Sequence, residues 1–336
     1  MSKKDKEKIL QRIRAKRSLY SKKRRIEYLK RKLNDIGKTQ SDKYFENLIR
    51  NSISMKLPSV FSLRENTVET IKFINKLKEL ESSNSRIYLN MKNVEEISNG
   101  TIALLLSVVN DFTTKGKKII GSKPKKSEPK RILELSGFFN YMNGSVEYPS
   151  EVNSNTIVEQ GNKSVEPQST AKIVKTAMKT VTGTEQRNKK LQGLFIELMA
   201  NSINHGFPNN KRKKWIVSTS HYKKEKCVSF SFIDNGVGIL KTLNQKIDRK
   251  LITLFKGKSD LLKSAFKGDI GSRTGLPFRG KGLPFIKDKH DTNRISNLFI
   301  LTNNVILDYK HQKFYEIGIS YSGTFYYFEL NSNNNL

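Results

Sequence analysis

The 336-residue chain contains a single cysteine, and this scarcity excludes an internal disulfide framework. Cys227 lies in an apolar stretch, where a small hydrophobic role is more common than a catalytic one. The N-terminus is charged and lacks the apolar core of a signal peptide, and the longest apolar run, near Ile102–Val109, is too short to cross a bilayer. We therefore expect a cytoplasmic protein without a transmembrane segment.

Acidic residues are also scarce: 31 Asp and Glu stand against 63 Lys and Arg, which gives a formal net charge of +32. A surface of this sign attracts polyanions and releases their counterions on binding. We expect a nucleic-acid or nucleoprotein partner, although charge does not distinguish DNA from RNA. The alternative is that the lysines only keep the protein in solution.

Residues 1–55 are predicted to form a basic, helical N-terminal arm. Within residues 1–34, Ile26, Leu29 and Leu33 recur at helical spacing among basic side chains. Such a stripe fits nucleic acid, a protein groove or an anionic membrane surface, or it packs on its own domain. The candidate nucleic-acid contacts are Lys22, Lys23, Arg24, Arg25, Lys30 and Arg31.

Residues 56–142 alternate between strand and helix patterns. Arg86–Val94 alternates as a strand, Gly100–Phe112 carries one apolar helical face, Lys118–Gly121 is a second strand, and Pro129 opens a short helix. Short connections between such elements predict a small α/β sheet with parallel strands.

This segment resembles a STAS domain, the regulatory fold of anti-anti-sigma factors. The resemblance is carried by NVEEIS, NGTIALLLSVV, KKIIGSKP and EPKRILELSGFFNYM and covers about 85 residues. Asn99 stands where that family has a phosphorylatable serine, so no phosphorylation switch is carried over. The resemblance implies a protein partner for this domain. Residues 143–168 are rich in Asn, Ser, Glu and Gly and are predicted to be a surface linker.

Residues 169–336 carry four short motifs in a fixed order. A predicted helix contains Glu197 and Asn201 one turn apart in ELMANSINH, and an apolar strand runs into IDNGVGI. RGKGLPF and SGTFYYFEL follow. Each motif is weak alone, but together they resemble the GHKL (Bergerat-fold) superfamily, which includes gyrase B subunits, MutL proteins, heat-shock chaperones, histidine kinases and anti-sigma kinases.

The resemblance implies an α/β sandwich that binds ATP with Mg²⁺. Asp234 would accept a hydrogen bond from the adenine amino group, at the position where guanine offers a carbonyl instead. Asn201 would supply an oxygen ligand to Mg²⁺, and Glu197 would activate the water that attacks the γ-phosphate. The predicted ATP-binding residues are Asn201, Asp234, Gly236, Gly238, Arg279, Gly280, Lys281, Gly282, Leu283 and Thr324.

The predicted sheet is mixed, is covered by helices on one side and uses strands at 215–220, 227–233, 298–302, 305–309, 314–317 and 325–330. The basic segment between Ile239 and Gly280 is predicted to be a mobile lid.

Three functions remain open. The first is an ATP-dependent regulatory switch with slow hydrolysis, coupled to a basic partner-binding surface and suited to bacterial stress or antiphage defence. The second is a serine/threonine kinase of the anti-sigma type, and the third is a nucleic-acid-binding protein with a structural nucleotide. A sensor histidine kinase is disfavoured because all four histidines lie within the predicted ATP-binding segment. A homodimer is compatible with each function.

Overall fold

The computed structural model describes residues 20–28, 39–83, 86–136, 138–139, 156–162, 165–206, 214–270 and 281–336. The chain divides into two compact units, Met1–Ile53 and Ser54–Leu336. In the first unit, residues 20–28 are helical, and α2 (Gln40–Arg50) begins at a capping box in which Thr39 and Asp42 satisfy each other's backbone N–H groups. Within the described ranges, no helix is both long and apolar enough to cross a membrane.

The N-terminal part of the second unit is an α/β layer. Its three-stranded sheet has the order β1-β3-β5, with β3 and β5 parallel, and β2 pairs with β4 in parallel. Its elements, in chain order, are β1 (Ser52–Lys56), β2 (Val60–Phe61), α3 (Thr67–Glu79), a 3-10 turn (Leu80–Ser82), β3 (Arg86–Asn90), β4 (Glu96–Ile97), α4 (Asn99–Thr114), β5 (Ile119–Gly121) and α5 (Ser127–Leu135). The elements predicted for this segment are therefore present, and α3, β2 and β4 are additions to them. The prediction of a helical arm over residues 1–55 was wrong at its end, because β1 begins at Ser52.

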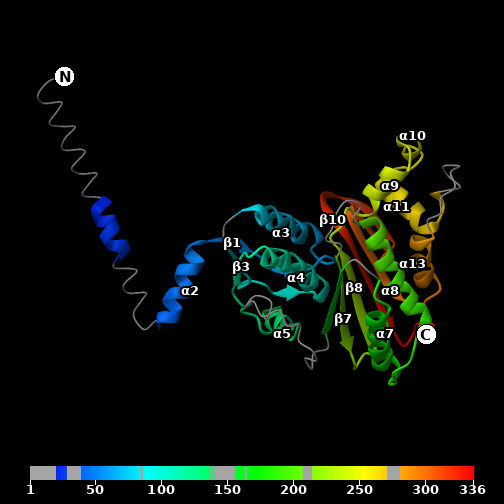
Figure 1. The fold of residues 1–336 in the computed structure, drawn as a ribbon, viewed down its shortest axis with the longest axis horizontal. Helices are drawn as coiled ribbons and strands as arrows, with labels where there is room; N and C mark the ends of the chain where they lie inside the picture. Colours follow the sequence, from blue (N-terminus) through cyan, green and yellow to red (C-terminus); the bar gives the residue numbers. More distant parts are fainter. Residues whose placement is uncertain are drawn as a thin grey trace, which may run out of the picture. The chain divides into compact units, whose positions relative to one another are not determined.

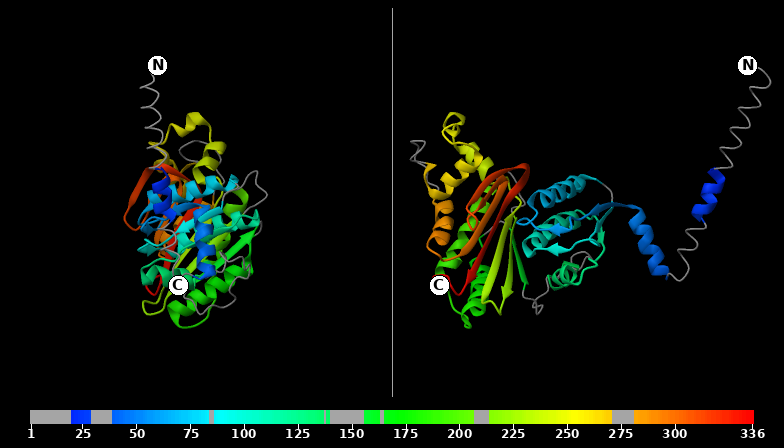
Figure 2. Two further views of the ribbon diagram at one scale, coloured as in Figure 1. Left: turned by 90° about the vertical axis from the view of Figure 1, so that its left-hand side faces the viewer. Right: turned by 180° about the vertical axis from the view of Figure 1, so that it is seen from behind.

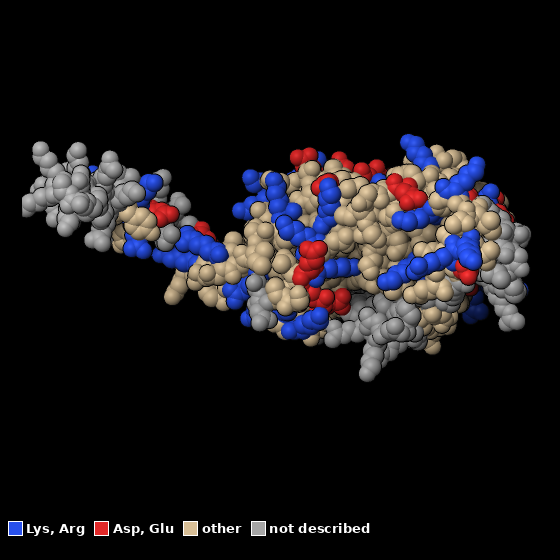
Figure 3. All heavy atoms as spheres, turned by 90° about the horizontal axis from the view of Figure 1, so that it is seen from above, with Lys and Arg blue, Asp and Glu red and all other residues tan. Residues whose placement is uncertain are grey.

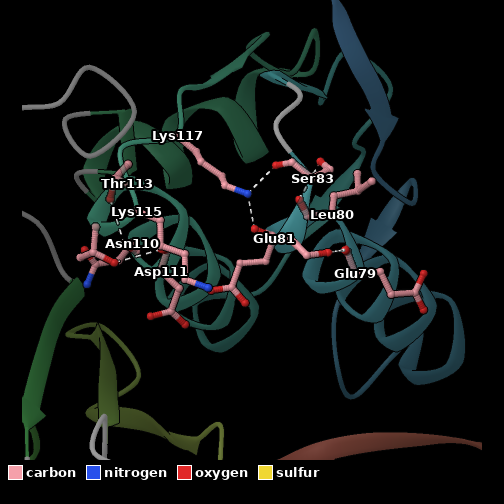
Figure 4. Close-up of polar contacts among 11 residues, drawn as sticks. Glu79, Leu80, Glu81, Ser83, Asn110, Asp111, Thr113, Lys115 and Lys117 are labelled. Carbon is pink, nitrogen blue, oxygen red and sulfur yellow. Dashed lines mark hydrogen bonds and ion pairs between the residues drawn. The ribbon is translucent and has the colours of Figure 1, made fainter.

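Two lysines that follow α4 bond to residues just after α3 (Figure 4). The Lys117 ammonium donates to the backbone carbonyls of Glu81 and Ser83, and Lys115 pairs with the Glu81 carboxylate at 2.6 Å. Carbonyls at a helix C-terminus have no partner within the helix, so a cation is a favourable partner for them. These contacts fix the two long helices of the layer against each other at one end.

The C-terminal part is built on a five-stranded sheet with the order β6-β7-β8-β10-β9. The strands are β6 (Thr156–Asn162), β7 (Lys214–Tyr222), β8 (Cys227–Asp234), β9 (Ser296–Asp308) and β10 (Lys313–Asn331). The helices are α7 (Pro167–Thr182), α8 (Lys189–Asn201), a π-helical turn (Ser202–Gly206), α9 (Ile239–Lys246), α10 (Arg249–Ile252), α11 (Lys258–Lys267) and α13 (Gly282–Asp291). The mixed α/β class predicted from the sequence is confirmed.

The sheet differs from its prediction in three respects. Every pairing in it is antiparallel, so the prediction of a mixed sheet was wrong. Two pairs of predicted strands are continuous as β9 and β10, because β-bulges and a positive φ at Asn303 absorb the turn-forming residues without ending the pairing. Residues 156–162, assigned to a linker, form the edge strand β6, which pairs with β7 along its length.

Helices cover both faces of the sheet, whereas the sequence predicted a cover on one side (Figures 1 and 2). One face packs on α7, α8, α9, α11 and α13 through residues such as Val217, Phe230 and Phe328. The opposite face packs on α3 and α4 of the N-terminal layer through Ile216, Ile233 and Phe325. Side chains alternate between the two faces of a strand, so β7 and β8 contribute to both cores.

Small side chains let α4 approach the sheet closely. Four serines of β7 and β8 are buried: Ser218, Ser220, Ser229 and Ser231. A Cβ placed on Gly100 of α4 would lie 2.4 Å from the Ser231 Oγ atom, and the Asn99 amide donates to the Ser220 hydroxyl at 2.5 Å. Because α4 is apolar on nearly all sides, it suits a position buried between two sheets.

Candidate functional site

A row of four residues crosses the sheet on the face that packs against α8. Asp234 ends β8 and lies opposite Trp215 of β7 and Thr324 of β10, and Thr324 lies opposite Thr302 of β9. Trp215 is 1% exposed and stacks on Phe232, so it belongs to the core. The row places the Asp234 carboxylate on the sheet surface beneath the helices, which we call the floor of the site.

The Asp234 carboxylate is buried, and burial raises its pKa to about 6. Hydrogen bonds from the Gly236 backbone N–H, at 2.9 Å, and from Thr324 act in the opposite direction, as does the charge of Lys78. Thr324 donates through both its hydroxyl and its backbone N–H, so the carboxylate has three fixed donors and retains a lone pair for one more. It is an acceptor held in one orientation.

The loop after Asp234 depends on glycine and on an asparagine that the sequence did not single out. Gly238 has a φ of +85°, and a Cβ there would lie 2.4 Å from the Asn303 side chain. The Asn303 amide donates to the Val237 carbonyl at 2.9 Å and accepts from the Leu240 N–H at 3.1 Å. The Thr302 hydroxyl accepts from the Ile239 N–H at 2.9 Å. Thr302 and Asn303 thus shape the Gly236–Gly238 loop.

Gly323, directly before Thr324, is also constrained. Its φ is +130°, and a Cβ would lie 2.0 Å from the Asp234 carbonyl oxygen. Only glycine permits that approach of β10 to the end of β8.

Glu197, Asn201 and Gly282 converge where α8 meets the first turn of α13. A Cβ built on Gly282 would lie 2.0 Å from the Glu197 Oε1 atom and 3.0 Å from the Asn201 Nδ2 atom. The two polar atoms are consequently at most about 5 Å apart. The Asn201 Nδ2 atom is buried and has no hydrogen-bond partner among the described residues. Such a group is costly to leave unsatisfied, so it marks a place where a ligand would be stabilising.

The start of α13 has no side-chain cap. Gly282 and Leu283 are half-buried there, and Lys281 is exposed. Uncapped backbone N–H groups at a helix N-terminus can bind an anion. Arg279 and Gly280, the other predicted residues of this motif, lie outside the described residues.

Tyr326 links the two ends of the site. It lies two residues beyond Thr324 on β10, is buried, and has its pKa raised well above the usual value by burial and by the charges of Asp234 and Glu197. Both carboxylates therefore lie near one tyrosine, which places the Asp234 floor and the Glu197–Asn201–Gly282 cluster in the same region.

The N-terminal layer reaches the back of this site through Asn235. The Asn235 side chain donates to the Ser107 hydroxyl of α4 and accepts from the Lys78 ammonium of α3 at 3.4 Å and from the Tyr321 hydroxyl at 3.2 Å. Burial lowers the pKa of Lys78, and the charges of Asp111 and Asp234 oppose that effect. Sequence reasoning missed these contacts because they join residues more than 80 positions apart.

The segment predicted to be a mobile lid is largely part of the core. Leu240, Leu243, Leu262 and Phe266, on α9 and α11, are buried against the sheet. Apolar residues at helical spacing explain this packing. Residues 271–280 of the predicted lid lie outside the described residues.

On the face of the second unit that Figure 3 shows, acidic side chains lie among the described Lys and Arg side chains. Lys22, Lys23, Arg24 and Arg25 lie exposed on the helix at 20–28, where the Arg24 guanidinium also stacks over the Tyr20 ring at 5.4 Å. Lys30 and Arg31 lie outside the described residues.

The part of the chain that the structure describes contains no group of three or more His, Cys, Asp or Glu side chains that could hold a metal ion. No protein-family model matches the chain, and a search of curated proteins gives no match.

Proposed function

We propose that residues 169–336 bind ATP with Mg²⁺ in a GHKL-type pocket, and that residues 56–142 are a STAS-like layer attached to it. The observation that carries the proposal is the convergence of Glu197, Asn201 and Gly282 beside an uncapped helix N-terminus, on the sheet face that also holds Asp234. These residues come from three separate motifs of the sequence.

At the base end, the buried Asp234 carboxylate would accept a hydrogen bond from the adenine amino group. Its other acceptor positions are directed by Gly236 and Thr324, so adenine would meet an oriented partner rather than a mobile one. Guanine presents a carbonyl at the same position and would be rejected, because two acceptors would face each other without a proton.

At the phosphate end, the N–H groups of Gly282 and Leu283 and the charge of Lys281 suit the phosphates. A bound Mg²⁺ would neutralise charge on them, and Asn201 fits the requirement for an oxygen ligand beside retained waters. The unpartnered Asn201 Nδ2 atom is a donor and would bond a phosphate oxygen, and the absence of a side chain at Gly282 lets the helix start approach Glu197 and Asn201 closely.

Glu197 would accept the proton of a water that attacks the γ-phosphorus. The bond from that phosphorus to the bridging oxygen breaks, and ADP and inorganic phosphate result. We expect slow hydrolysis by the isolated protein.

Nucleotide binding would act as a switch on the rest of the chain and on a basic, nucleic-acid-binding surface that includes the arm. The contacts of Lys78 and Ser107 with Asn235 support this, because they join α3 and α4 to the residue next to Asp234. A kinase acting on its own STAS-like layer is less well supported, since Asn99 is engaged with Ser220 against the sheet.

Calorimetry of the full chain with MgATP and MgGTP tests the proposal. We expect ATP to bind and GTP to bind at least tenfold more weakly, equivalent to about 1.4 kcal/mol. Equal binding of the two nucleotides, or no binding of either, would remove the assignment of Asp234 to adenine.

A further inference from the structure

We propose that a cavity between α11, α13 and the β9–β10 hairpin binds a small phosphate dianion, either inorganic phosphate or the phosphate group of a monoester. The cavity has a volume of about 210 Å³. Its lining residues are Lys263, Lys267, Lys287, His290, Asp291, Tyr309, Gln312 and Phe314. No part of the nucleotide proposal uses them.

The charge of the lining favours an anion. Three lysines face one aspartate, and that aspartate already pairs with Lys287. Lys263 and Lys267 lie one turn apart on α11 and make no ion pair with a described acidic residue, while the Lys263 ammonium lies 4.6 Å from the centre of the Phe314 ring. A lysine ammonium binds phosphate as a point charge with three donors.

One buried polar atom in the lining lacks any partner. The Tyr309 hydroxyl has no hydrogen-bond partner among the described residues, and Tyr309 is only 7% exposed; the His290 Nδ1 atom, by contrast, lies 3.5 Å from an Asp291 carboxylate oxygen. Burial raises the pKa of Tyr309, so its hydroxyl is a neutral donor. Buried polar groups are normally satisfied, and an anion that accepts from this hydroxyl would remove the deficit.

The carboxyl end of α13 does not oppose an anion as strongly as a free helix end would. The carbonyls of Asp288, Lys289 and His290 accept backbone hydrogen bonds from residues 292–295. These bonds use the acceptors that carry the negative end of the helix dipole.

The size of the cavity sets the class of ligand. It is smaller than the roughly 300–1,000 Å³ typical of sites for drug-sized molecules. It would hold a phosphate group with little attached to it. The site is also separate from the nucleotide site, because Gly282 and His290 lie eight residues apart on one helix, a rise of about 12 Å.

Calorimetry of the full chain with inorganic phosphate, at ionic strength matched with chloride, tests the proposal. We expect phosphate to bind, and Lys263→Gln with Lys267→Gln to weaken it at least tenfold. Lys310→Gln is the matched control, because Lys310 is exposed on the hairpin and does not line the cavity; it should change the affinity less than twofold. Equal weakening by Lys310→Gln, or no binding beyond that of chloride, would overturn the site.

Tyr309→Phe gives a second measurement. The denaturation midpoint without phosphate should stay the same or rise, because the lost hydroxyl had no partner, while phosphate affinity should fall at least threefold. A lower midpoint with unchanged phosphate affinity would show that the hydroxyl is structural and overturn its role. Glycerol phosphate should compete with phosphate. If an oligonucleotide binds through Lys263 and Lys267 while phosphate and glycerol phosphate do not, the site belongs to nucleic acid and the proposal fails.

Discussion

Gly282→Ala should separate the chemistry of the proposed site from the stability of the fold. The new methyl carbon would lie 2.0 Å from the Glu197 Oε1 atom, whereas favourable separations of such atoms are about 3.5 Å. The carboxylate would therefore have to move by about 1.5 Å. Displacement of a catalytic group by about 1 Å can lower a rate roughly 100-fold, so we expect single-turnover ATP hydrolysis to fall by about that factor.

Stability should change little, because the clashing atom is the end of a flexible side chain. Alanine is favoured over glycine by about 1 kcal/mol in a helix interior, and at the first residue of α13 a smaller gain offsets part of the strain. Urea unfolding measures this balance, and calorimetry with MgATP measures whether binding survives.

Gly193→Ala on α8 is the matched control. Its Cβ would lie 3.5 Å from the Phe285 Cζ atom, an ordinary contact, so turnover should be unchanged and stability unchanged or higher. Wild-type turnover in Gly282→Ala, or an equal loss in Gly193→Ala, would refute the proposed juxtaposition of Gly282 and Glu197.

The remaining predictions concern the same site and the arm. Asp234→Asn should weaken ATP binding by roughly 2 kcal/mol, because an amide donor would face the adenine amino group; a folded variant with unchanged calorimetric affinity would exclude this contact. The wild-type affinity should also fall as pH drops through about 6, since burial raises the pKa of Asp234 to that value, and Asp234→Asn should lack this component. The pH dependence of stability has the opposite sign. The folded state holds the Asp234 proton more tightly than the unfolded state, so the contribution of Asp234 to the unfolding free energy decreases as pH rises from 3.8 to about 6. Glu197→Ala should retain MgATP and lose turnover, and hydrolysis at the wild-type rate would remove Glu197 as the base. Binding of duplex DNA should weaken with salt, with about 0.9 in the log–log slope for each phosphate contact, and deletion of residues 1–34 should flatten that slope; a gel-shift salt series with an unchanged slope would exclude the arm.

The sequence predicted the parts of the site that depend on local pattern. Asp234 follows an apolar strand and precedes two glycines, and Glu197 and Asn201 lie one turn apart on an amphipathic helix, so their elements could be assigned without a structure. Asn303 could not be assigned in this way. An Asn-Asn pair in the sequence indicates a turn, whereas here the backbone at Asn303 has a positive φ beside a register shift, stays paired with β10, and is held by side-chain bonds to Val237 and Leu240.

The sequence did not predict that helices cover the second face of the sheet, and this has a different cause. The residues of β7 and β8 that face α4 include serines, which a hydropathy pattern assigns to solvent. β6 was missed because its sequence, TIVEQGN, is largely polar and contributes one edge of the sheet. Both features depend on partners far away in the chain, and alternation along one strand does not identify the partner.

The position of β10 in the sheet bears on how the second unit folds. Residues 313–331 form a strand between β8 and β9, so β9 cannot join the sheet until these C-terminal residues have been synthesised. Until then α3 and α4, which are synthesised far earlier, have no complete sheet face to pack against. Because the two hydrophobic cores share this sheet, loss of either would expose the other. Residues 54–336 should therefore unfold as one cooperative body, with neither half persisting alone.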